Sequence, residues 1–193
     1  MHTFLRGALL VAVILIVGSL ILHQRSMKEH TDIVAPPDYK NISYTIDGEK
    51  VDLMNGVAET EAAPGSASKT VTRYFGNVLH TDLDSDGQED VVFLLTQETG
   101  GSGTFFYVVA ARKTAQGYEG SDGYFLGDRI APQTIEESQD PDHANVIVVN
   151  YADRNADEPM TATPSVGKSV YLKLDTARMQ WGIVLPDFEG ESR

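Results

Sequence analysis

The sequence has no cysteine among its 193 residues. This absence excludes disulfides, thiolate-ligated zinc or iron–sulfur sites, and a cysteine nucleophile. Oxygen-rich metal sites and hydroxyl or carboxylate chemistry remain. With this length and 41% hydrophobic residues, we expect one cored domain and not two.

Basic residues are also scarce, because 15 Lys and Arg stand against 28 Asp and Glu and the formal net charge is −13. No run of Lys or Arg alternates with aromatic residues, so we expect no nucleic-acid partner. The charge is unevenly distributed. Residues 1–28 carry three basic residues and no acid, which gives +3, whereas the other 12 basic residues and all 28 acids leave −16 on residues 29–193.

Only one long apolar run is present, at residues 7–22, and as a helix it would be about 24 Å long. The run predicts an uncleaved signal anchor within residues 1–28. A cleaved signal peptide is the alternative, with a weak cleavage site at 17–19, but residues 20–22 continue the apolar run past it. We expect a single pass through the cell membrane, with the N-terminus in the cytoplasm and the long acidic part extracytoplasmic.

Residues 29–40 are polar and contain Pro36-Pro37, which favours an extended chain. The predicted organisation is therefore an anchor at 1–28, a linker at 29–40 and an extracytoplasmic domain at 41–193.

From residue 41 onward no segment of eleven or more residues places apolar side chains at helical spacing, and short strand-like runs recur instead. Turn signals separate them at Asp47-Gly48, Asn55-Gly56 and residues 100–103. The two most apolar runs, 91–96 and 104–111, predict the central strands. Further strands are expected at 42–46, 51–53, 70–79, 124–126, 134–137, 145–151, 169–174 and 180–185. This pattern predicts an all-β fold, an antiparallel β-sandwich or barrel of about nine strands.

One motif has carboxylates at a spacing that suits the binding of a metal ion. The stretch TDLDSDGQED at 81–90 places carboxylates at positions 1, 3, 5 and 9 of a tight loop, with Gly87 at position 6. A hard cation such as Ca²⁺ needs six to eight oxygen ligands, and alternate carboxylates can supply them. The predicted metal ligands are Asp82, Asp84, Asp86, the backbone carbonyl of Gln88, and Asp90.

The loop is not an EF-hand, because position 12 is Phe93 and a strand-like run follows at once. The pattern D-x-D-x-D-G-x-x-D before apolar residues resembles the calcium loops of FG-GAP and VCBS-type β-repeats. That resemblance implies a Ca²⁺-binding loop between two strands. The motif occurs once here, so no propeller is expected.

Residues 41–175 more broadly resemble small, uncharacterised, membrane-anchored exported proteins of bacteria with reduced genomes. The stretches that carry this resemblance are YFGNVLHTDLDSDGQEDVVFLL, GGSGTFFYVVAA, FLGDRIAPQT and VIVVNYADRNADEPM. The resemblance implies no particular activity.

A phosphate-loop pattern, ATPSVGKS at 162–169, is not interpreted as a nucleotide site, because the alternating residues after it predict a strand where a helix is required. The leading hypothesis is a non-enzymatic, membrane-tethered domain with one structural Ca²⁺, which binds an unidentified protein or other partner at the cell envelope. Two alternatives stay open: a small envelope hydrolase that uses carboxylates, and an acidic inhibitor of a basic, lysozyme-like enzyme.

Overall fold

The computed structural model describes residues 38–184, and every regular element among them is a β-strand. The predicted anchor lies outside the described residues. No helix in the described part is long and apolar enough to cross a membrane. The strands are β1 (Ser43–Ile46), β2 (Glu49–Asp52), β3 (Val57–Glu61), β4 (Lys69–Thr81), β5 (Asp90–Glu98), β6 (Phe105–Thr114), β7 (Gly117–Gly120), β8 (Tyr124–Asp128), β9 (Ala131–Glu137), β10 (Val146–Asp153), β11 (Val166–Asp175) and β12 (Gln180–Ile183).

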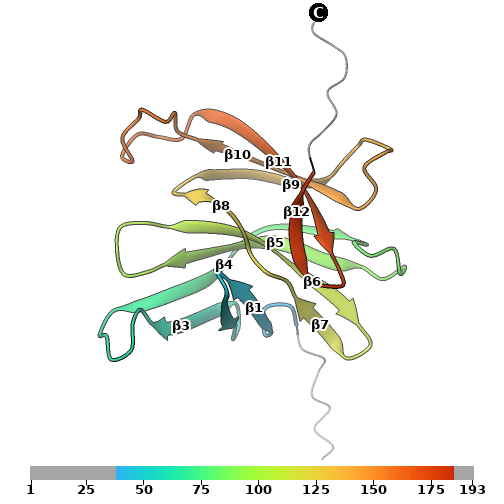
Figure 1. Ribbon diagram of the computed structural model, residues 1–193, viewed down its shortest axis with the longest axis horizontal. Coiled ribbons are helices and arrows are strands. Elements are labelled where there is room, and N and C mark those ends of the chain that lie inside the picture. Colours follow the sequence, from blue (N-terminus) through green and yellow to red (C-terminus); the bar gives the residue numbers. More distant parts are fainter. Residues whose placement is uncertain (1–37, 185–193) are drawn as a thin grey trace, which may run out of the picture. The chain divides into compact units, whose positions relative to one another are not determined.

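These strands form three sheets, and all paired strands run antiparallel (Figure 1). β1 and β2 form a hairpin, and a four-stranded sheet has the order β12-β11-β10-β9. The largest sheet has the order β3-β4-β5-β6-β7, and β8 pairs with the other half of β6. The all-β, antiparallel prediction is therefore confirmed for the described residues.

β5 and β6 lie in the middle of the large sheet, and both of their faces are buried. Six consecutive residues of β5, from Asp90 to Leu95, are buried. Their side chains alternate between two separate clusters, since Val92 and Leu94 belong to one and Val91, Phe93 and Leu95 to the other. A strand buried on both faces reads as a continuous apolar run, which explains why this segment shows no polar alternation.

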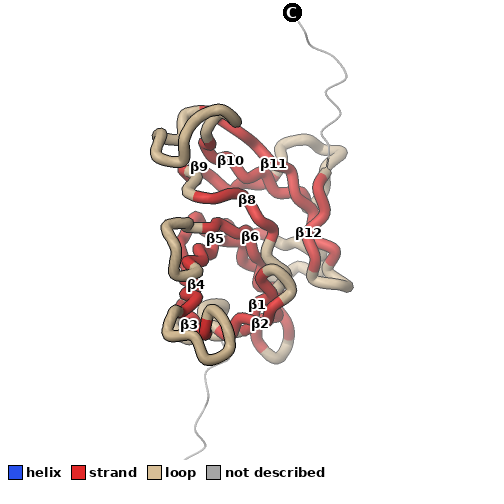
Figure 2. Tube along the Cα trace, turned by 60° about the vertical axis from the view of Figure 1, so that its left-hand side comes forward, coloured by secondary structure: helices blue, strands red, loops and turns tan. Residues whose placement is uncertain are grey.

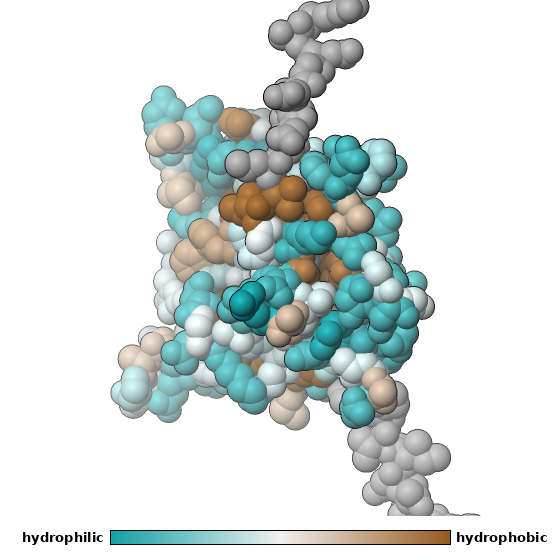
Figure 3. Space-filling model, turned by 45° about the vertical axis from the view of Figure 1, so that its right-hand side comes forward, coloured by the Kyte–Doolittle hydropathy of each residue, from teal (hydrophilic) through white to brown (hydrophobic). Residues whose placement is uncertain are grey.

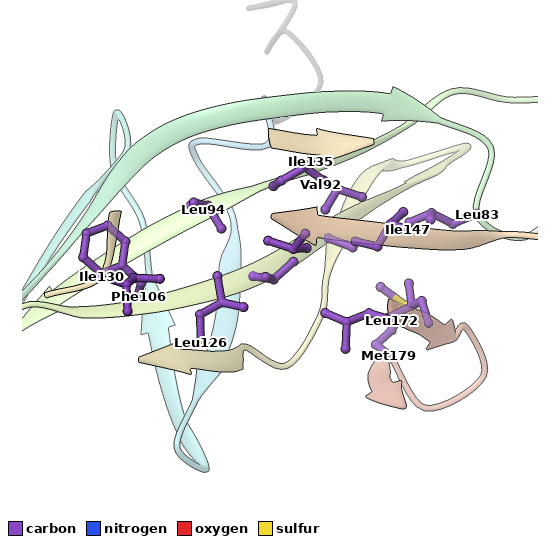
Figure 4. Close-up of a cluster of buried hydrophobic side chains, with 14 residues drawn as sticks. Leu83, Val92, Leu94, Phe106, Leu126, Ile130, Ile135, Ile147, Leu172 and Met179 are labelled. Atoms are coloured by element: carbon purple, nitrogen blue, oxygen red, sulfur yellow. The ribbon is translucent and has the colours of Figure 1, made fainter. Parts of the chain in front are cut away.

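The first cluster, here called the sandwich layer, fills the space between the large sheet and the four-stranded sheet. Figure 4 shows its side chains, among them Val92, Ile135 and Leu172, gathered between strands of both sheets. Its buried members are aliphatic apart from Phe106 and Met179. Two facing sheets packed in this way form the β-sandwich part of the fold.

The second cluster, here called the aromatic layer, lies on the opposite face of the large sheet under the β1–β2 hairpin. The Phe93 ring has its centroid 5.4 Å from those of Tyr39 and Tyr74 and 5.6 Å from that of Tyr44. Tyr39 belongs to the stretch predicted as the end of the linker. Figure 2 shows the large sheet curled with the hairpin around this layer, as a half-barrel beside the four-stranded sheet.

The curl is accompanied by an irregularity in β4. Its pairing with β5 shifts register on both sides of Gly76, where Gly76 and Asn77 have φ of 126° and 53°. Such bulges bend a strand and increase its twist. The Asn77 side chain also donates to the carbonyl of Gln133 at 3.0 Å, which links β4 to β9 of the other sheet.

The described residues form twelve strands, so the prediction of about nine is too low, although the ten predicted ranges overlap ten of these strands. The sequence interpretation missed β3 and β7. β3 is short and acidic, and β7 has four residues of which two are glycine, so neither carries an apolar alternation. The turn predictions at Asp47-Gly48 and Asn55-Gly56 are confirmed, since all four residues have positive φ.

Hydrophilic residues dominate the surface face drawn in Figure 3, where an apolar patch interrupts them. Among the described residues, the most exposed large apolar side chains are Met54 (75%), Ile183 (59%) and Phe125 (50%). Exposed apolar side chains are common on protein surfaces. Phe125 differs from Met54 and Ile183 because it lies beside a surface pocket, as described below.

Candidate metal-binding loop

The Asp-rich loop connects β4 to β5, at the right of Figure 1. Asp82, Asp84 and Asp86 each place one carboxylate oxygen so that the three atoms lie within 4.8 Å of one another. Asp82 and Asp84 are half-buried, and Asp86 is exposed. The structure thus brings together three of the four predicted carboxylate ligands.

Backbone N–H groups organise these carboxylates. Asp82 accepts hydrogen bonds from the N–H of Gly87 at 2.9 Å and of Asp86 at 3.2 Å, and Asp84 also accepts from the N–H of Asp86 at 3.2 Å. The loop can turn this tightly because Ser85 and Gly87 have φ of 62° and 83°. The Gly87 hydrogen bond leads the effects that lower the pKa of Asp82. Asp82 therefore stays ionised at neutral pH.

Gln88 is hydrogen-bonded to the Asp86 carboxylate. Its backbone N–H and its side-chain amide donate to the two oxygens of Asp86, both at 2.7 Å. This pair of hydrogen bonds holds the Asp86 carboxylate in place.

Asp90 stands apart from the other carboxylates. It is only 1% exposed, and its two oxygens accept hydrogen bonds from the backbone N–H of Leu83 at 2.9 Å and of Lys113 at 2.7 Å. Burial is the largest effect on its pKa and raises it. In this structure Asp90 links the start of the loop to the end of β6 and does not join the converging group.

Arg112 on β6 is a residue of this region that sequence reasoning missed. Its Nη1 lies 3.6 Å from Asp84 Oδ2, and its Nη2 pairs with Glu119. Arg112 is therefore shared between two acids and offsets only part of the loop's charge. The β5–β6 register, which pairs Val91 with Ala111, brings Arg112 beside the loop, so only a correct strand pairing could have found it.

A polar cavity of about 390 Å³ adjoins the loop. It lies between the loop and the β9–β10 connection, and Asp82, Asp140 and His143 line it. Asn145 donates to the Ser85 hydroxyl at 2.8 Å and ties the two connections together. Figure 1 shows both connections on the same side of the molecule.

The second half of the phosphate-loop pattern, residues 166–169, lies in a strand. Gly167, Lys168 and Ser169 belong to β11, and the Lys168 ammonium pairs with Asp153 at 2.7 Å. A strand offers no helix N-terminus toward a phosphate.

Comparison with protein-family models, curated proteins and solved structures gives no match to this chain.

Proposed function

We propose that this chain is a membrane-tethered extracytoplasmic domain that binds one structural Ca²⁺ in the β4–β5 loop and serves as a binding module at the cell envelope. Asp82, Asp84 and Asp86 are the carboxylate ligands in this proposal. The Gln88 carbonyl is a further oxygen ligand, and Asp90 fixes the loop to the neighbouring strand. The convergence of the three carboxylates within 4.8 Å is the observation that carries the proposal.

The donor set suits a hard divalent cation. All of its members are oxygens, and Ca²⁺ accepts six to eight oxygens at about 2.3–2.6 Å in flexible geometry. Three carboxylates this close repel one another, and Arg112 approaches only Asp84. A bound cation would remove that repulsion and would fix the β4–β5 connection beside the polar cavity.

The envelope setting rests on the sequence. The apolar run at 7–22 supports a membrane tether, and the −16 that follows it supports an exported acidic domain. In a chain without disulfides, a bound ion is one way to stabilise an exported fold.

The test is thermal unfolding of the full chain in detergent, in EDTA, in 10 mM Mg²⁺ and in 10 mM Ca²⁺. A Kd of roughly 10⁻⁴–10⁻³ M, common for extracellular modules, corresponds to a stabilisation of about 1.4–2.7 kcal/mol at this Ca²⁺ concentration. The Tm should then rise by about 3–10 °C in Ca²⁺, and by less in Mg²⁺.

The double substitution Asp84→Ala with Asp86→Ala should abolish the Ca²⁺-dependent rise. Glu49→Ala with Glu98→Ala is the matched control, since it removes two exposed acids elsewhere and should keep the rise. An unchanged Tm of the wild-type chain at 10 mM Ca²⁺ would refute the proposed metal site.

A further inference from the structure

A second pocket lies at the other end of β5. It has a volume of about 420 Å³, and Gln97, Thr99, Phe105, Tyr107, Phe125 and Asp47 line it. These residues come from the end of β5, the start of β6, β8 and the β1–β2 turn. Figure 1 shows the β5–β6 connection at the left of the molecule, whereas the Asp-rich loop lies at the right.

Three aromatic rings form the apolar part of this pocket. The centroid of the Phe125 ring lies 5.5 Å from that of Tyr107 and 6.3 Å from that of Phe105, with interplanar angles of 53° and 49°. Phe125 is 50% exposed, whereas Tyr107 is 2% exposed. The pocket therefore offers tilted ring surfaces of which only part faces solvent, and not one flat platform.

A single charged group lines the pocket, the carboxylate of Asp47. The buried Tyr107 hydroxyl donates to one of its oxygens at 2.6 Å, which fixes its position. No Lys or Arg lines the pocket, and no ion pair involves Asp47 within residues 38–184. An oriented carboxylate beside aromatic rings thus lacks a counter-charge.

The pocket lining also includes the side-chain amide of Gln97. The side-chain amide of Gln97 already donates to Thr72 at 3.2 Å, and its oxygen has no partner among the described residues. Aromatic faces attract cations, most strongly where water is partly excluded. The complement of this pocket is a group that combines positive charge with an apolar surface.

We propose that this pocket binds the ammonium group of a small organic cation, with Asp47 as the counter-charge and Phe125 as the principal aromatic contact. A neutral sugar fits less well, because stacking favours a flat exposed ring and a sugar leaves the Asp47 charge uncompensated. The inference is independent of the metal site, which lies at the opposite end of β5.

The test is saturation-transfer NMR on the full chain in detergent, with choline as the probe and glucose as the neutral comparison. Choline should give a saturable signal in the millimolar range with or without EDTA. Asp47→Asn should weaken choline binding about 3- to 30-fold, and Phe125→Leu should weaken it by a similar factor. The Asn variant should fold, since Asn-Gly suits the same turn and still accepts from the Tyr107 hydroxyl.

Two matched controls should leave choline binding unchanged. Asp157→Asn removes one exposed carboxylate elsewhere, and Phe75→Leu removes a similarly exposed ring that packs on Phe106. Absence of a choline signal at 50 mM, or equal binding by wild type and Asp47→Asn, would overturn the proposal. Glucose binding that is unaffected by Asp47→Asn would identify a sugar site instead.

Discussion

The sandwich layer and the aromatic layer lie on opposite faces of the same two strands but are filled by different kinds of side chain. Facing sheets supply many side chains from both sides, so aliphatic residues of moderate size close the sandwich layer. The four-residue strands of the β1–β2 hairpin supply few, and the aromatic layer is closed by large rings such as Tyr44 and Phe93. In this fold the face covered by the smaller element contains more of the large aromatic side chains.

The largest expected effect comes from removing the ring at the centre of the aromatic layer. Phe93→Ala should lower the free energy of unfolding by about 3–5 kcal/mol, and Leu94→Ala, on the opposite face, by about 2–5 kcal/mol. Both residues are fully buried. Urea unfolding measures these losses.

Near-UV circular dichroism distinguishes a loss of packing in the aromatic layer from a loss of packing in the sandwich layer. Phe93→Ala should reduce the tyrosine signal strongly, because three tyrosine rings pack on Phe93, whereas Leu94→Ala should change it little. An equal loss of signal in both variants would show that the layers are not independently packed.

The sequence predicted the central strands well, since the run at 91–95 is apolar on both faces. It could not assign Val92 and Phe93 to different layers, because that division depends on the elements packed above and below. Tyr39 and Tyr74 approach Phe93 from distant parts of the chain, and no local pattern records that contact.

The candidate metal site also combines local features that the sequence predicts with contacts between distant segments that it does not predict. Asp82, Asp84 and Asp86 are close in sequence, so their spacing alone predicted that they converge. Asp90 fits the same spacing, but its role depends on two backbone N–H groups, one of them from Lys113 on another strand. The pairing of Arg112 with the loop is equally nonlocal.

The next largest effect is expected where the β1–β2 hairpin packs against β7 at the edge of the aromatic layer. A Cβ at Gly120 of β7 would lie 2.1 Å from the carbonyl oxygen of Ser43, so Gly120→Ala must displace the hairpin. We expect a loss of about 1–3 kcal/mol in the free energy of unfolding. Gly167→Ala is the control, because nothing lies within 4 Å of its Cβ, and it should be neutral or stabilise by about 0.5 kcal/mol.

Denaturant unfolding measures both glycine variants. The hairpin also reaches the segment after β7 through backbone hydrogen bonds, from Thr45 N–H to the Ser121 carbonyl and from Gly123 N–H to the Thr45 carbonyl. A wild-type stability for Gly120→Ala would mean that the hairpin covers the layer more loosely than these contacts indicate.

The smallest expected effect is a sensitivity of the aromatic layer to alkaline pH. Burial raises the pKa of Tyr44 far above its ordinary value of 10.0, and the nearby charge of Asp38 adds to this. Below pH 10 the hydroxyl is protonated in both states and its ionisation contributes nothing to the pH dependence. Above pH 10 the unfolded chain releases the proton and the folded chain keeps it, so stability falls by up to about 1.4 kcal/mol per pH unit.

Tyr44→Phe removes this contribution. At pH 7 the variant should be less stable by about 0.5–1.5 kcal/mol, because the hydrogen bond from the Tyr44 hydroxyl to the Tyr39 carbonyl is lost. Between pH 10 and 11 its stability should fall less steeply than that of the wild type, as measured by urea unfolding at each pH. Leu94→Ala, which is destabilised without losing a titrating group, should keep the wild-type slope. Equal slopes in Tyr44→Phe and wild type would show that the Tyr44 hydroxyl ionises as readily in the folded chain as in the unfolded one, so that the hairpin does not exclude water from this layer.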